Sequence, residues 1–112
     1  MKIETKKENR VMVVTFQGSL DVSNQTKLKD TLAGIADAGE SDVVFDFKDV
    51  NFIDSSCLGV LVAITKRLRE IKGDIKLTGL SDDVRSIFQI TRLDRIFEIF
   101  ASNKEAVDSF YR

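Results

Sequence analysis

Histidine and proline are missing from this chain of 112 residues, and cysteine occurs only once, as Cys57. Without histidine, acid–base catalysis by an imidazole is excluded, and zinc loses its commonest nitrogen ligand. A single thiol forms no internal disulfide and is too little for a metal cluster. We therefore expect no metal and no cofactor. The lack of proline removes slow prolyl isomerisation from folding.

No charge sign dominates, and no long apolar run is present. The 17 basic and 18 acidic residues are interspersed and give a net charge of -1. This pattern predicts no direct nucleic-acid binding and no membrane association. Every apolar run is far shorter than the roughly 18 residues of a membrane span. Because no apolar segment follows residues 1–5, we expect no signal peptide and a cytoplasmic, reducing location.

The composition is that of an ordinary globular protein, with 43% hydrophobic and 31% charged residues. A chain of this length builds one hydrophobic core without disulfides or metals. We find no internal repeat, no low-complexity tract and no linker. The sequence therefore predicts one domain over residues 1–112, monomeric or weakly dimeric when free.

Apolar periodicity predicts an alternation of strands and helices, in the order β-β-α-β-α-β-α-β-α. Strands are expected near residues 3–5, 11–16, 43–47, 74–78 and 96–100. In the third strand, Val43, Phe45 and Phe47 share one face, and Val44 and Asp46 share the other.

Four helices are expected between and after these strands. They are capped by Asp21 or Ser23, by the segment at Asp54, by residues 81–83, and by Ser102 or Asn103; Gly39 and Gly73 end the first two. Strand–helix–strand alternation from residue 43 to residue 100 implies parallel strands joined by right-handed crossovers. The predicted fold class is α/β, with a mixed sheet of about five strands. Its parallel centre carries an N-terminal antiparallel addition.

The most informative segment is Phe52–Val60, which ends a strand and begins a helix. It places the hydroxyls of Ser55 and Ser56 at a helix N-terminus, beside the carboxylate of Asp54. A phosphate added there would meet backbone N–H groups and the positive end of the helix dipole. Loops that follow parallel strands also lie at the carboxyl edge of the sheet, where partners usually dock.

Helix capping is the simplest alternative for these three side chains. Asp54, Ser55 and Ser56 are all good N-cap residues, but only one of them can occupy that position. A serine nucleophile needs a base, and Lys66 lies about two to three helical turns beyond. The chain also lacks a Gly-x-Ser-x-Gly elbow and a glycine-rich phosphate loop. We therefore expect that this protein is not an enzyme.

The helix that follows carries two unusual residues. Cys57 is interpreted as a small core residue, although a helix N-terminus lowers a thiol pKa and leaves redox sensing as an alternative. Gly59 costs roughly 1 kcal/mol relative to alanine. It either admits another backbone or a nucleotide, or packs against a neighbouring strand. The first two turns, residues 57–64, are apolar almost all round, which predicts that a second apolar face meets something else.

These segments resemble the anti-sigma factor antagonists, the small stand-alone STAS domains, over essentially the whole length. The best local matches are Gly18-Ser19-Leu20-Asp21, Val43 to Asp49 and Phe52 to Val60, with support from Ile90 to Phe97. The resemblance implies a STAS-like fold in which a partner kinase phosphorylates the serine two positions after the Asp, here Ser56. It also implies that Asp21 lies near this phosphoacceptor and the kinase nucleotide.

The resemblance further implies control by partner switching. The unphosphorylated form binds an anti-sigma factor that is a GHKL-type serine kinase and frees a sigma factor. Phosphorylation of Ser56 breaks the complex, and a serine phosphatase restores it. The expected environment of the partner and the phosphate comprises Asp21, Asp54, Ser55, Cys57, Leu58 and Gly59. Cys57 stands where the family commonly has Gly, which predicts narrower kinase access. The alternative is a STAS scaffold or regulatory module whose output is not a sigma factor.

Overall fold

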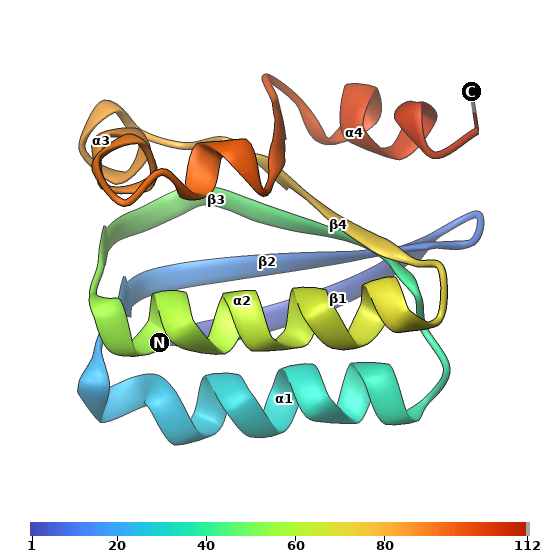
Figure 1. Cartoon of the computed structure of the whole chain (residues 1–112), viewed down its shortest axis with the longest axis horizontal. Coiled ribbons are helices and arrows are strands. Elements are labelled where there is room, and N and C mark those ends of the chain that lie inside the picture. Colours follow the sequence, from blue (N-terminus) through green and yellow to red (C-terminus); the bar gives the residue numbers. More distant parts are fainter. Residues whose placement is uncertain (112) are drawn as a thin grey trace.

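The computed structural model describes residues 1–111, and Figure 1 shows the arrangement of its elements. The strands are β1 (Lys2–Glu8), β2 (Val11–Leu20), β3 (Asp42–Ile53), β4 (Asp74–Thr78) and β5 (Glu98–Phe100). The α-helices are α1 (Gln25–Asp37), α2 (Ser55–Glu70), α3 (Asp82–Ile90) and α4 (Asn103–Ser109). Two short 3-10 helices are η1 (Val22–Asn24) and η2 (Leu93–Arg95).

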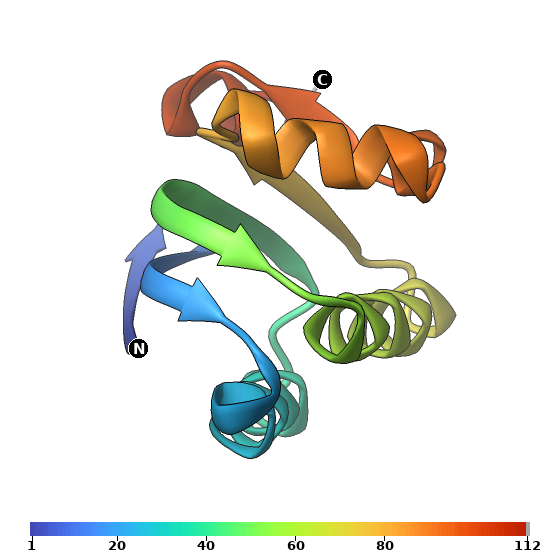
Figure 2. The same ribbon diagram turned by 90° about the vertical axis from the view of Figure 1, so that its left-hand side faces the viewer.

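The five strands form one sheet in the order β1-β2-β3-β4-β5. β1 pairs antiparallel with β2, and the other neighbours are parallel. Because parallel neighbours follow each other along the chain, right-handed crossovers place their helices on the same face. α1, α2 and α3 all contribute to the main core, and α4 packs on the opposite face (Figures 1 and 2). The predicted α/β fold class is confirmed.

The alternation predicted for β3 separates two cores of different size. Val43, Phe45 and Phe47 face the main core, where Phe16 lies 5.3 Å from Phe45 and 5.5 Å from Phe47 between ring centroids. On the other face, Val44 belongs to a small cluster that includes residues of α4. The main core therefore positions α1 and α2, which carry the residues considered below.

Strands β2 and β3 are longer than their local patterns predict. The sequence indicates a break at Gly18, yet β2 continues to Leu20, and β3 continues to Ile53 instead of ending at residue 47. β2 and β3 continue to pair in parallel beyond these points, with shifts of register between Thr15 and Gln17 and between Gly18 and Ser19, and their last pair is Leu20 with Ile53. β5 is shorter than expected, because the amides of Ile96 and Phe97 bond back to the Leu93 carbonyl and close the η2 turn. The two long strands end side by side, which brings the loops after them together.

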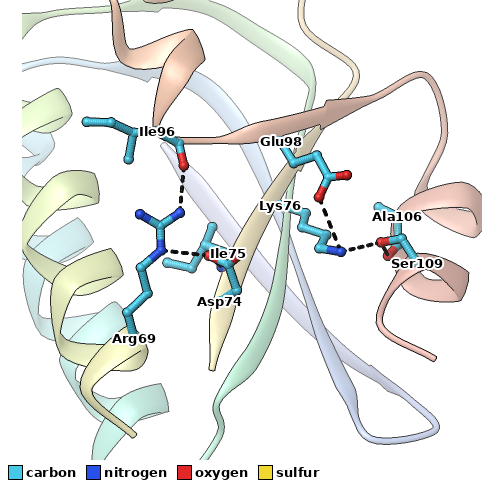
Figure 3. Close-up of polar contacts among 8 residues, drawn as sticks. All are labelled: Arg69, Asp74, Ile75, Lys76, Ile96, Glu98, Ala106 and Ser109. Carbon is cyan, nitrogen blue, oxygen red and sulfur yellow. Dashed lines mark hydrogen bonds and ion pairs between the residues drawn. The ribbon is translucent and has the colours of Figure 1, made fainter. Parts of the chain in front are cut away.

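Polar contacts hold β5 and α4 in place (Figure 3). Lys76 Nζ donates a hydrogen bond to Ser109 Oγ at 2.6 Å, lies 3.5 Å from Glu98 Oε1 and stands 4.4 Å from the Phe110 ring centroid. Nearby, Arg69 on α2 donates to the Ile96 carbonyl at 2.6 Å. The C-terminal part of the chain is thus tied to the sheet through a few side chains.

The helices of residues 1–111 include none with the length and apolar character that crossing a membrane requires.

Candidate functional site at the N-terminus of helix α2

The site lies at the carboxyl ends of β2 and β3. The Asp54 amide donates a hydrogen bond to the Leu20 carbonyl at 3.0 Å, which joins the two loops at their first residues. Asp21 then begins η1, and Asp54 begins α2. The predicted site residues 21 and 54 are therefore neighbours in space, although 33 positions separate them in sequence.

Asp54 is the N-cap of α2, as its extended backbone and side-chain bonds show. One carboxylate oxygen, Oδ1, accepts from the Ser56 hydroxyl at 2.6 Å and from the Cys57 amide at 3.2 Å. The other, Oδ2, accepts from the Val22 amide at 2.9 Å. The Ser56 hydroxyl is the main reason that the pKa of Asp54 is lowered, and the backbone amides add to it against desolvation. The carboxylate is therefore charged at neutral pH.

Because Asp54 is the N-cap of α2, neither Ser55 nor Ser56 occupies the capping position. Ser55 is the first residue of α2 and is exposed, whereas Ser56 is half-buried and donates its hydroxyl to Asp54. The Cys57 amide, one of the helix N–H groups expected to receive a phosphate, is already bound by the Asp54 carboxylate. Phosphorylation of Ser56 would remove the hydroxyl proton that Ser56 donates to Asp54. The phosphate would then face the Asp54 carboxylate.

Asp21 caps its own turn and does not hydrogen bond to Ser56. Its Oδ1 accepts from the Ser23 amide at 3.0 Å and from the Ser23 hydroxyl at 2.5 Å. The expectation that Asp21 or Ser23 caps the helix carrying Leu28 and Leu32 is wrong. The short turn η1 intervenes, so Asp21 caps η1, and α1 begins at Gln25 with Asn24 as its N-cap and without a side-chain capping bond. Its backbone carbonyl lies 3.4 Å from Cys57 Sγ, so the Asp21 loop contacts α2 through the thiol.

Cys57 and Leu58 point into the protein. Cys57 is fully buried, and Leu58 is 6% exposed within the main core. Burial raises the pKa of the Cys57 thiol, and the charges of Asp54 and Asp21 raise it further, so the expected lowering by the helix N-terminus does not prevail. The buried Cys57 Sγ lies 4.0 Å from Ser56 Oγ, and narrower kinase access at this position stays a prediction.

Gly59 is exposed on α2, and a Cβ added to it would meet nothing within 4 Å. The interpretation that this glycine packs against a neighbouring strand is therefore wrong. The space above it belongs to a surface groove between α1 and α2, with Ser56 at one end.

One apolar side chain beside the site was missed from the sequence. It is Val22, which is 70% exposed. Val22 follows Asp21 directly and gives its amide to Asp54, so its side chain is held at the rim of the site. An apolar residue in a polar loop was the available signal, but the local pattern did not place it beside the α2 N-terminus.

Comparison with known proteins places the chain in a family. The family model described as STAS domain matches residues 2–106. This chain belongs to the STAS family. This STAS domain is 31% identical over 110 residues to BtrV of Bordetella bronchiseptica, covering 98% of this chain and 95% of that protein. It is also 31% identical over 107 residues to the anti-sigma-B factor antagonist of Bacillus subtilis, covering 96% and 97%.

Solved structures share the fold of this STAS domain. The crystal structure of TM1081 from Thermotoga maritima is 26% identical and has a TM-score of 0.93, covering 98% of this chain and 95% of that one. The Bacillus protein SpoIIAA is similar at TM-scores of 0.77 in its unphosphorylated form and 0.76 in its phosphorylated form. These matches are 20% and 22% identical, and each covers at least 97% of both chains. The fold is thus equally similar to both forms of SpoIIAA.

Proposed function

We propose that this STAS domain is an anti-sigma factor antagonist that works by partner switching in the cytoplasm. Its unphosphorylated form binds an anti-sigma factor that is a GHKL-type serine kinase, and a sigma factor is released. Phosphorylation of Ser56 breaks the complex, and a serine phosphatase removes the phosphate. The domain acts by binding and performs no catalytic step. The names of its relatives, including the anti-sigma-B factor antagonist of Bacillus subtilis, support this proposal.

The observation that carries the proposal is the Ser56 hydroxyl, bonded to Asp54 at 2.6 Å on a half-buried surface at the sheet edge. A phosphoserine brings a charge of about -1.5 to -2. Alone in solvent, that charge is hydrated, and the fold tolerates it. Under a docked protein it would be desolvated beside the Asp54 carboxylate, which is costly. The modification therefore acts on the complex and spares the free domain.

The surroundings of Ser56 also suit a docked protein. Exposed Val22 supplies apolar contact area near the hydroxyl, because its amide is bound by the same Asp54 carboxylate that holds Ser56. Large exposed apolar side chains beside polar groups are typical of interaction sites. We propose that the partner covers Val22 and aligns its nucleotide with Ser56.

The test is incubation of the purified domain with a GHKL-type anti-sigma kinase from the same genome and ATP, followed by mass spectrometry. We expect one mass increase of about 80 Da, located on Ser56. Ser56→Ala should abolish the increase, whereas Ser55→Ala, one residue away, should retain it. A mass increase that persists in Ser56→Ala would overturn the assignment of the phosphoacceptor.

Binding of the same kinase tests the switch itself. Ser56→Asp should weaken binding by about two orders of magnitude, which corresponds to about 2.8 kcal/mol. Ser55→Asp introduces the same charge at an exposed position and should weaken binding much less. Thermal unfolding of both variants should stay near that of the wild type. Unchanged kinase affinity of Ser56→Asp would contradict the proposed switch.

A further inference from the structure

The groove between α1 and α2 begins at Ser56 and extends to Arg67, with a volume of about 400 Å³. Figure 1 shows the two helices running side by side in the same direction, and Figure 2 shows them nearly end-on and adjacent. On α2 the groove follows Ser56, Val60, Ala63 and Arg67, a spacing of four, three and four residues. This is the second apolar face that the sequence predicted for α2.

The facing row on α1 has the same kind of spacing. Gln25, Lys29 and Leu32 line the groove at intervals of four and three residues, and of the α1 lining only Leu32 and Ala33 are apolar. The apolar stripe therefore comes mainly from Val60, Ala63 and Ile64 of α2. A groove with such a stripe between two adjacent parallel helices can receive a third helix, and no segment within residues 1–111 fills it.

Gly59 keeps the Ser56 end of this groove open. Glycine within a helix costs about 1 kcal/mol relative to alanine. Because a Cβ at Gly59 would meet nothing within 4 Å, packing inside this chain does not explain the glycine. Its missing side chain deepens the groove next to Ser56.

The charges on the rim indicate the kind of helix that fits. Lys29 and Arg67 both line the groove, and no acidic side chain of residues 1–111 does so. Arg67 also pairs with Asp37 outside the lining. A second copy of this chain would bring the same two cations against them, which disfavours self-association through this face. Acidic residues flanking an apolar stripe would complement it.

We propose that this groove binds an amphipathic helix of the kinase that contacts Ser56, with its apolar face over Gly59 and its acidic residues against Lys29 and Arg67. This inference rests on the proposed function, and it adds a second contact that extends away from the phosphoacceptor along α2. The groove contact supplies affinity, and the Ser56 contact switches it.

Matched variants separate the groove from the rest of the surface. Gly59→Leu fills the groove, and Gly34→Leu makes the same change at an exposed glycine of α1 whose added Cβ also meets nothing within 4 Å. Lys29→Glu reverses a rim charge, and Lys66→Glu makes the same reversal on an exposed part of α2 outside the groove. All four positions are exposed, so loss of folding is not expected, and circular dichroism checks it.

The measurement is the affinity of each variant for the purified GHKL-type kinase, together with the KM and kcat of Ser56 phosphorylation. Gly59→Leu and Lys29→Glu should each raise Kd and KM at least tenfold and leave kcat within twofold. Gly34→Leu and Lys66→Glu should change all three values less than twofold. Added salt should weaken wild-type binding more than binding of Lys29→Glu.

Other results overturn the inference. If Ser56 is phosphorylated and all four variants bind like the wild type, the groove proposal fails and the proposed function stands. If the wild type neither binds the kinase nor accepts phosphate from it, both fail. A self-associated wild type that Gly59→Leu makes monomeric would assign the groove to a second copy. A small amphiphile that native mass spectrometry finds on the wild type and not on Gly59→Leu would assign it to a small ligand.

Discussion

At the scale of single residues, Asp54 links the parts of the site. Its carboxylate caps α2 through the Cys57 amide, holds the Ser56 hydroxyl and accepts the Val22 amide from the neighbouring loop. One charged side chain therefore sets the geometry of the phosphoacceptor and joins the β2 loop to α2. A neutral residue here would loosen both loops at once.

We predict that the stability contribution of Asp54 depends on pH. The pKa of Asp54 is lowered in the folded protein, mainly by the Ser56 hydroxyl, so the folded state favours the ionised form. This contribution is fully present above the pKa of the unfolded chain and is lost as pH falls through the lower folded pKa. Urea unfolding between pH 2.5 and 7 would measure this contribution as the difference in the free energy of unfolding between the wild type and Asp54→Asn. The pKa of an aspartate in the unfolded chain is about 4.

The stability difference between the two proteins should be largest at neutral pH and shrink in the acid range. Ser56→Ala should narrow the same difference, because it removes the hydroxyl that lowers the pKa most. A difference that stays constant down to the lowest pH would contradict the assignment of this carboxylate.

At the scale of elements, the starts of α2, α3 and α4 were predictable, whereas the start of α1 and the strand ends were not. Asp54, Ser81 and Ser102 cap their helices as the sequence predicted or allowed, because capping depends on a few adjacent residues. The extension of β2 and β3 depends on pairing between Leu20 and Ile53, which lie far apart in the chain. Local pattern contains no information on that pairing.

The candidate site follows the same division. Ser56 beside Asp54 was predictable from one short segment, because both lie on the same helix start. The orientation of Cys57 and the exposed side chain of Val22 depend on how the Asp21 loop packs against α2. The open space over Gly59 required the position of α1, which no local motif specifies.

We predict that α4 is the least stable helix and that Lys76 holds it. α4 has only seven residues, too few for independent stability. Lys76 donates to Ser109 (Figure 3). Its Nζ also stands 4.4 Å from the Phe110 ring centroid, and its side chain is only 10% exposed. A charged hydrogen bond and a shielded cation–π contact are each worth on the order of 2 kcal/mol. Lys76→Ala should therefore speed amide hydrogen exchange in α4 at least tenfold.

The matched control for α4 is Lys104→Ala, which removes an exposed pair with Asp108 on the same helix. Exposed pairs spaced by four residues contribute only about 0.3–0.5 kcal/mol. Exchange in α4 should then change about twofold. Amides of α1 and α2 should exchange as in the wild type in both variants. Equal effects of Lys76→Ala and Lys104→Ala on α4 would refute the role assigned to Lys76.

At the scale of the whole molecule, the two edges of the sheet decide whether copies associate. β5 offers only three residues to a neighbouring strand. β1 is longer, but it carries Lys2, Glu4, Lys6 and Glu8 in alternation, paired at 2.9 Å and 3.8 Å between nitrogen and oxygen. Charged side chains on an edge oppose strand pairing with another molecule. Neither edge of the sheet therefore favours pairing with a second copy.

We therefore predict a monomer of 12.6 kDa at micromolar concentration, measured by light scattering after size-exclusion chromatography. Replacing Lys2, Glu4, Lys6 and Glu8 together by valine removes these edge charges and should produce larger species, because an apolar edge strand is a template for pairing. The control replaces as many exposed charges of each sign away from the edge by valine and should leave the mass unaltered; its positions are Lys66, Glu70, Asp83 and Arg85. A wild type with twice the expected mass would show that edge charge does not control association. It would also favour the scaffold alternative over partner switching.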